Sequence, residues 1–97
     1  MENQLVHDVL LALGTKCLIY RCNVIVAGRL RSLPNGHADV LACVGGRYVA
    51  IELKSPSGRQ SEQQKNYQAA VERSGGIYIL ARSVQDVLDR LPPSASG

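Results

Sequence analysis

The sequence predicts an α/β fold in which a mixed sheet of about four strands is flanked by helices, in the order αβββαβα. Two β-rich segments, 39–44 and 47–54, flank a Gly-Gly pair, a strong signal for a two-residue hairpin turn. Segments 2–13 and 61–74 carry apolar residues at helical spacing on either side of this hairpin. The short apolar run 77–80 then predicts a further buried strand.

The first half of the chain divides into a helix, a strand and an irregular stretch. Residues 2–13 are expected to form an amphipathic helix that ends at Gly14. Its apolar side chains share one stripe of the helix: Leu5, Val6, Val9 and Leu13. Residues 17–24 are expected to form the first strand, and an irregular stretch continues to the turn-like Asn35-Gly36 before the hairpin.

The second half begins where residues 55–58, Ser-Pro-Ser-Gly, break the strand pattern. Ser61 is the expected N-cap of a helix that Gly75-Gly76 ends. Ser83 with Asp86 resembles a capping box and predicts a last helix that continues to Leu91. Residues 1–91 are therefore expected to form one domain, and residues 92–97 a frayed tail.

Composition limits the classes of function. The chain has 97 residues, a net charge of +3 and 45% hydrophobic residues, which is typical of one small domain with a mild attraction for polyanions. No apolar run approaches the ~18 residues of a membrane span, and the N-terminus lacks the pattern of a signal peptide. A cytoplasmic location is expected.

The cysteines do not form a metal-binding pattern. Cys17, Cys22 and Cys43 are odd in number and lack a CxxC pair, whereas a structural zinc site takes four ligands at short paired spacings. They are expected to be buried, reduced thiols in apolar strands.

The hairpin brings charged residues together. A two-residue turn at the Gly-Gly pair places Val44 opposite Arg47 and Asp39 opposite Glu52. Lys54 shares their face, since residues two apart on a strand do so. Like charges directly opposite each other are destabilising, so this arrangement predicts a bound divalent cation and a nuclease-like site.

Two further polar residues interrupt the apolar stripes of the helices. Glu2 lies in the middle of the first stripe, so its carboxylate is either directed at the sheet or placed in the first turn to complement the helix dipole. Gln64 shares a stripe with Tyr67 and Val71, and is either a site residue or an ordinary surface glutamine. Helix periodicity and hairpin pairing direct these residues and the charged set to one place.

Asp39 followed by Glu52-x-Lys54 resembles the core motif of the PD-(D/E)xK nuclease superfamily. The flanking sequences resemble the VRR-NUC domain, the virus-type replication-repair nuclease module, along nearly the whole chain. The segments that carry this resemblance are 20–23, 36–39, 50–54, 58–64 and 75–78. Ala38 stands where the superfamily motif has proline, which is a mild departure.

This resemblance implies a restriction-endonuclease-like core and a particular division of roles. Asp39 and Glu52 match the family's metal-ligating carboxylates, together with Glu2 and the backbone carbonyl of Leu53. Lys54 matches the catalytic lysine of the motif, and Gln64 is expected to support the catalytic site. The chain resembles stand-alone phage and bacterial members, which implies a homodimer that cuts four-way (Holliday) DNA junctions in a bacterial or phage-infected cell.

The expected reaction is metal-dependent hydrolysis of phosphodiester bonds. Mg²⁺ or Mn²⁺ is the expected cofactor, because hard oxygen ligands suit these ions. Basic side chains are expected to contact the phosphates of the DNA: Arg21, Arg29, Arg31 and Lys65. Two alternatives stay open from the residues alone. One is a flap, nicking or restriction-type nuclease, and the other is a non-catalytic nucleic-acid-binding module.

Overall fold

The computed structural model describes residues 2–22 and 34–93, with only the backbone described for residues 2 and 3. The order of elements is the predicted αβββαβα, which confirms the fold class. The elements are α1 (Glu2–Leu13), β1 (Leu18–Arg21), β2 (Val40–Val44), β3 (Arg47–Leu53), α2 (Glu62–Arg73), β4 (Ile77–Ala81) and α3 (Val84–Arg90).

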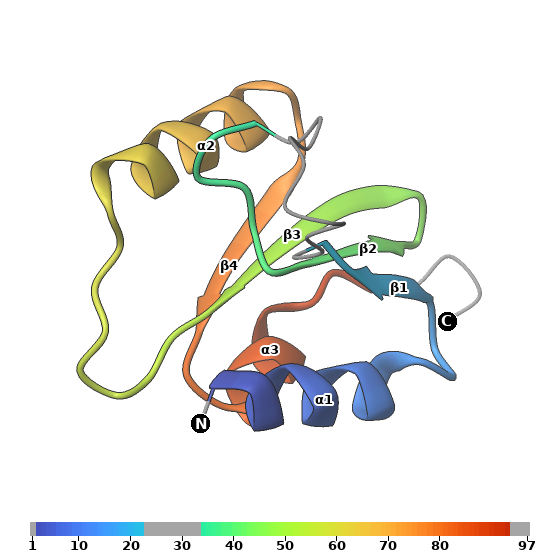
Figure 1. Ribbon diagram of the computed structural model, residues 1–97. Coiled ribbons are helices and arrows are strands. Elements are labelled where there is room, and N and C mark those ends of the chain that lie inside the picture. Colours follow the sequence, from blue (N-terminus) through green and yellow to red (C-terminus); the bar gives the residue numbers. More distant parts are fainter. Residues whose placement is uncertain (1, 23–33, 94–97) are drawn as a thin grey trace, which may run out of the picture.

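The sheet is mixed and its strands lie in the order β1-β2-β3-β4. β1 and β2 are antiparallel, as are β2 and β3, whereas β4 runs parallel to β3. α2 makes the connection between the two parallel strands and lies on one face of the sheet, while α1 and α3 lie together on the other (Figure 1). The central strand β3 is therefore covered on both faces, as its continuous burial toward Leu53 shows.

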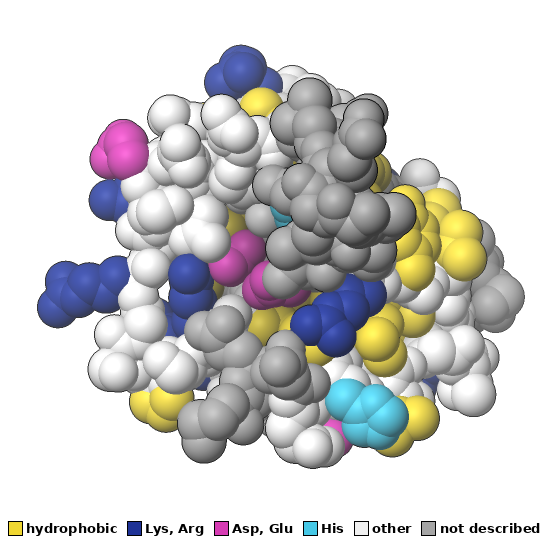
Figure 2. Space-filling view, viewed as in Figure 1, with side chains coloured by type: hydrophobic (Ala, Val, Ile, Leu, Met, Phe, Trp, Pro, Cys, Tyr) yellow, Lys and Arg dark blue, Asp and Glu magenta, His cyan; other side chains and the backbone are white. Residues whose placement is uncertain are grey.

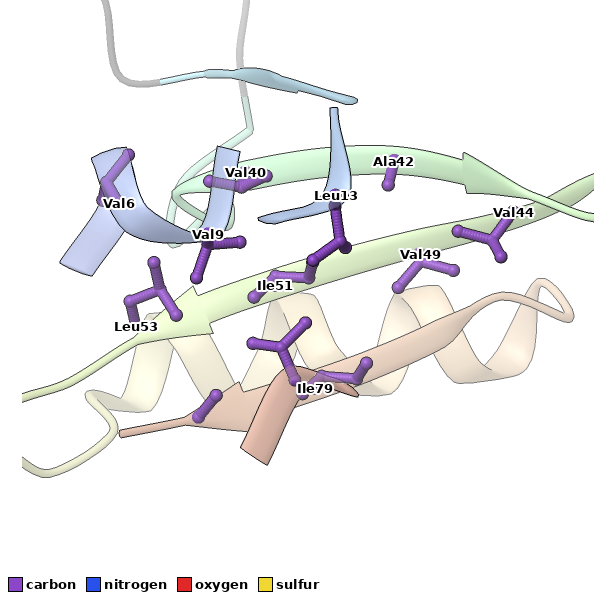
Figure 3. Close-up of a cluster of buried hydrophobic side chains, with 12 residues drawn as sticks. Val6, Val9, Leu13, Val40, Ala42, Val44, Val49, Ile51, Leu53 and Ile79 are labelled. Atoms are coloured by element: carbon purple, nitrogen blue, oxygen red, sulfur yellow. The ribbon is translucent and has the colours of Figure 1, made fainter. Parts of the chain in front are cut away.

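The main apolar core lies between the sheet and the pair α1 and α3. Val6, Val9 and Leu13 of α1 are buried, so the predicted stripe does face the sheet. They meet alternate residues of β3, including Ile51 and Leu53, whose side chains point to this face (Figure 3). Full burial of side chains of this size contributes about 1.5–3 kcal/mol each before the entropy cost of ordering them.

The opposite face of the sheet carries a smaller and more polar core beneath α2. Its buried residues are Ala38, Ala50, Tyr67 and Val71. The hydroxyl groups of Tyr48 and Tyr67 are 2.8 Å apart and share a hydrogen bond. The rings of Tyr67 and Tyr78 pack edge to face with their centroids 6.2 Å apart. Tyrosines therefore give this face both apolar packing and hydrogen bonds.

Two expectations need correction or restriction. Cys43 is exposed and not buried, because it points to the α2 face of β2 whereas α2 packs chiefly over β4. Cys17 is only partly buried, Cys22 is buried as expected, and all three cysteines are free thiols. Residues 23 and 24 of the predicted first strand, and residues 94–97 of the predicted tail, lie outside the described residues. No helix in the described part of the chain is long and apolar enough to cross a membrane.

Candidate active site

The turn between β2 and β3 has the predicted two-residue geometry. Gly45 and Gly46 have φ values of 58° and 82°, the positive values that a tight hairpin turn of this kind requires. Val44 pairs with Arg47 and Val40 with Ile51, so the predicted register is confirmed. One step beyond this last pair, the register places Asp39 at the level of Glu52.

Asp39 lies immediately before β2 and binds the end of β3. Its Oδ2 accepts a 2.8 Å hydrogen bond from the backbone N–H of Leu53. Its own backbone carbonyl accepts a 2.9 Å hydrogen bond from the N–H of Cys22, next to β1. These bonds fix the Asp39 carboxylate beside the residue that follows Glu52.

Glu52 is the only charged or polar residue of the described chain that is buried, with 3% of its surface exposed. Its Oε2 accepts a 2.8 Å hydrogen bond from Nε2 of Gln64 and lies 3.5 Å from Nζ of Lys54. Burial of a carboxylate is costly unless charges and donors compensate it. The amide and the ammonium group supply compensation at Oε2, and Lys54 is itself largely buried, with 15% of its side chain exposed.

Gln64 has a second role that the sequence-based prediction missed. Its Oε1 accepts a 2.8 Å hydrogen bond from the N–H of Ser61, while Oγ of Ser61 accepts from the N–H of Gln64. This is a capping box at the start of α2. The Ser-x-x-Gln spacing carried the signal, although only the N-cap Ser61 was predicted from it. The cap fixes the amide so that its nitrogen points at Glu52.

Gly36 places the loop before Asp39 against the first turn of α2. Its φ is 74°, and a side chain there would overlap the backbone of Gln63 and crowd that of Gln64. The ring of the neighbouring His37 is hydrogen-bonded through Nδ1 to the carbonyl of Ala38 at 2.8 Å. The close approach at Gly36 was not predicted, because it joins segments far apart in the sequence.

The turn after Lys54 is held by an arginine from the next strand. The N–H of Gly58 donates to the carbonyl of Ser55 at 3.0 Å, which closes the turn. One guanidinium nitrogen of Arg82 donates to both carbonyls of this turn, at 2.6 Å to Ser55 and 2.9 Å to Gly58. Gly58 in turn approaches the aliphatic stem of Lys54. Arg82, which the sequence did not indicate as a site residue, therefore holds the turn that lies against Lys54.

A tyrosine adjoins the two carboxylates. Burial raises the pKa of Tyr78 to about 12, and the hydrogen bond from Gln60 opposes this shift. The negative charges of Glu52 and Asp39 also raise this pKa, which places both carboxylates within electrostatic reach of the phenol. The Tyr78 hydroxyl is thus neutral at physiological pH.

Some of the remaining predicted site residues lie within the described part of the chain and some lie outside it. Gln4 and Leu5 line a pocket together with Lys54, so the first turns of α1 lie near this lysine. The side chain of Glu2 lies outside the described residues, as do Arg29 and Arg31 entirely. Arg21 and Lys65 are exposed, on β1 and α2. Acidic side chains gather near the centre of this face of the molecule, with basic side chains on both sides (Figure 2).

The oxygen atoms available at this site are of the type that binds a hard divalent cation. Two carboxylates and the carbonyl of Leu53 belong to three residues that the hairpin brings together, and oxygen ligands of this type suit Mg²⁺ or Mn²⁺. Among the described side chains, no group of three or more His, Cys, Asp or Glu residues is arranged for a metal ion. A third carboxylate would have to come from elsewhere, and Glu2 is the predicted source.

The fold and these residues together define an α/β domain with a carboxylate–lysine site at the open end of a hairpin. Two solved structures resemble it over most of its length. One, a "VRR_NUC domain protein", has a TM-score of 0.71 and 14% identity, with 91% of this chain and 82% of that chain covered. The other, a "VRR_NUC domain", has a TM-score of 0.70 and 14% identity, with 94% and 97% covered. The chain therefore has the fold of a VRR-NUC domain, as its resemblance implied. No protein-family model matches the sequence, and no curated protein matches it.

Proposed function

We propose that this chain is a metal-dependent, structure-specific DNA endonuclease of the VRR-NUC type, and that it acts as a homodimer on four-way DNA junctions. The observation that carries the proposal is the buried Glu52 carboxylate. It lies between the amide of Gln64 and the ammonium group of Lys54, beside Asp39. A purely structural carboxylate would gain little from burial at the end of a strand, because the desolvation cost is large.

Asp39, Glu52, the carbonyl of Leu53 and Glu2 are the groups proposed to hold Mg²⁺ or Mn²⁺. A bound divalent cation would polarise the scissile phosphate and lower the pKa of a water molecule. Gln64 orients Glu52 through its 2.8 Å hydrogen bond. Asp39 is oriented by its bond to the N–H of Leu53. These two bonds hold the carboxylates in place before substrate arrives.

Lys54 is proposed to act on the reacting phosphate. Its ammonium group lies 3.5 Å from Glu52, and the turn at residues 55–58 supports its stem. From this position the ammonium group would orient the attacking water, help its deprotonation through its positive charge and offset the charge that develops on the phosphate oxygens. The partial exposure of its side chain leaves it open to substrate on one side.

DNA is the proposed substrate because of the reaction class and the net charge of +3. Arg21, Arg29, Arg31 and Lys65 are proposed to contact phosphates, which positions a duplex without reading its sequence. Resolution of a four-way junction needs two matched cuts. A two-fold dimer would supply two symmetry-related sites for them.

A cleavage panel tests this proposal. Flap, nicked, duplex and four-way DNA substrates are incubated with the protein and Mg²⁺ or Mn²⁺, with a chelator as the metal-free control. Symmetric paired cuts confined to four-way junctions, together with a dimeric solution mass, are the expected result. Cleavage of flaps or nicked DNA instead would support the proposed reaction but show that the substrate is not a four-way junction. Binding without cleavage in every metal would overturn the nuclease function.

A matched variant distinguishes cleavage by this site from cleavage by a contaminating nuclease. Glu52→Gln keeps the size of the side chain and an oxygen that can accept from Gln64, but it removes the negative charge. It is expected to abolish cleavage and to retain junction binding. Normal cleavage by Glu52→Gln would show that the reaction takes place elsewhere.

A further inference from the structure

A pocket of about 250 Å³ lies next to Lys54. Gln4, Leu5 and Asp8 of α1 form one wall. Lys54 and Arg82, which directly follow β3 and β4, also line the pocket, as does Pro56. The pocket is smaller than most sites for drug-sized ligands. It therefore suits one nucleotide and not a larger group.

The negative and positive residues that line the pocket come from different secondary-structure elements. α1 presents the carboxylate of Asp8, which accepts a 2.8 Å hydrogen bond from Nε2 of Gln4. The strand ends present the two cations, Lys54 and Arg82. A phosphate group is attracted to the cations and repelled by the carboxylate. An uncharged ring with amino groups is favoured beside the carboxylate, because an ionised carboxylate only accepts hydrogen bonds.

The walls of the pocket are fixed by hydrogen bonds within the protein. Arg82 bridges the carbonyls of Ser55 and Gly58 and so holds the turn that carries Pro56. The bond from Gln4 orients the carboxylate of Asp8. A site that is already formed loses less entropy when its ligand binds.

We propose that this pocket binds the nucleotide next to the scissile phosphate, with its base beside Asp8 and its phosphate toward Lys54 and Arg82. This inference rests on the proposed nuclease function and adds a specificity-determining residue to it. Asp8 favours bases that carry an exocyclic amino group, namely guanine, adenine and cytosine. Thymine has no exocyclic amino group, and the two carbonyl oxygens beside its N3–H repel a carboxylate, so thymine is disfavoured.

The first experiment measures cleavage of junctions that differ only in the bases flanking the cut. The wild-type protein is expected to cut about tenfold more slowly where thymine or an abasic residue replaces guanine at the position that fills the pocket. Asp8→Asn, whose amide both accepts and donates, is expected to remove most of the discrimination against thymine. Equal rates for all flanking bases with the wild type would overturn the proposal.

The chain contains a matched control. On α3, Gln85 donates a 2.7 Å hydrogen bond to Asp89, with the same spacing as Gln4 and Asp8 on α1. Asp89→Asn therefore makes the same chemical change in the same kind of pair. It is expected to leave the base preference unchanged. An equal effect of Asp89→Asn and Asp8→Asn would overturn the proposal, since it would point to net charge and not to the pocket.

A binding measurement separates failure of this inference from failure of the proposed function. The full chain is titrated with deoxyguanosine monophosphate and with thymidine monophosphate, and amide NMR signals are recorded. Perturbation of the Leu5, Asp8 and Ser55 amides, stronger with the guanine nucleotide, is expected even if no DNA is cleaved. Absence of perturbation at these residues with both nucleotides would overturn the subsite, whatever the cleavage panel shows.

Discussion

Nε2 of Gln64 lies 2.8 Å from Oε2 of Glu52, while the other atom of the same amide caps α2. One side chain thus joins the start of a helix to the buried carboxylate of the proposed active site. The helix end and the carboxylate cannot move independently, because the amide is bonded at both of its polar atoms. Substitutions at Gln64 and Ser61 can separate the role of this amide in the helix cap from its role beside Glu52.

Gln64→Glu is expected to preserve the helix cap and impair the site. A glutamate still accepts from the N–H of Ser61, but it places a second carboxylate against Glu52 and removes the donor. Cleavage should fall by about 10²-fold or more. The control is Ser61→Ala, which should destabilise α2 by about 1 kcal/mol in urea unfolding and leave most of the activity. Equal activity of Gln64→Glu and the wild type would contradict the role of this amide.

Lys54→Ala is expected to lower kcat by about 10²- to 10³-fold with little change in KM, because it removes a charge that acts on the reacting phosphate. Lys65→Ala is the comparison, since Lys65 is exposed on α2. It should weaken DNA binding and reduce the slope of log affinity against log salt by about 1. A weaker affinity with unchanged kcat in Lys54→Ala would assign the lysine to binding alone.

Gly36→Ala and Gly46→Ala separate backbone strain from steric overlap. Both glycines have positive φ values, 74° and 82°. A Cβ at Gly46 meets nothing within 4 Å, whereas one at Gly36 overlaps the backbone of Gln63. Gly46→Ala should cost about 1–2 kcal/mol in unfolding free energy and leave kcat intact. Gly36→Ala should cost more and also lower kcat, because it displaces the turn that carries Gln64.

Arg82→Met is expected to lower kcat about tenfold or more by releasing the turn that supports Lys54. Arg90→Met provides the comparison, because Arg90 also donates to a backbone carbonyl, that of Leu80. Both variants should lose about 1 kcal/mol of stability, and only Arg82→Met should lose activity. Arg82→Lys should restore part of the lost rate. Similar rates for Arg82→Met and Arg90→Met would contradict the positioning role.

Stability is expected to fall in alkaline solution. Burial raises the pKa of Tyr78 from 10.0 to about 12, and burial likewise raises that of Tyr67. The folded protein therefore holds these protons more tightly than the unfolded chain. This stabilisation is complete below pH 10 and is lost as the pH rises through about 12. Urea unfolding measured across this range should show the loss, and Tyr78→Phe should reduce its slope.

The thiols add a separate alkaline component that the same titration must take into account. Burial raises the pKa of Cys17 and of Cys22 above 9.0, so their contribution begins to fall at lower pH than that of the phenols. Cys22→Ser should remove its share without changing the slope assigned to Tyr78. A slope in Tyr78→Phe equal to that of the wild type would contradict the assignment to this phenol.

The sequence predicted those features that depend on neighbouring residues. The pairing of Val44 with Arg47 followed from two glycines in a tight turn, and the N-cap at Ser61 from its side chain. The apolar stripe from Val6 to Leu13 followed from helical periodicity. Each of these depends on local geometry, which spacing in the chain determines.

The approach of Gln64 to Glu52 followed from the sequence, but other contacts between distant segments did not. The bonds from Arg82 to the turn after Lys54 span 27 and 24 residues, and no local pattern distinguishes this arginine from others. The approach of Gly36 to α2 similarly depends on how two segments pack. The exposure of Cys43 depends on which part of the sheet α2 covers, which apolar character alone does not specify.

The apolar core and the proposed catalytic groups depend on different side chains of strand β3. Its side chains at Val49, Ile51 and Leu53 belong to the large apolar core, whereas Glu52 points to the α2 face and its Oε2 lies 3.5 Å from Nζ of Lys54. Substitutions that alter chemistry on one face therefore leave most of the buried apolar area on the other face intact. New substrate preferences could accumulate around Glu52 and Lys54 while Ile51 and Leu53 continue to hold the domain together.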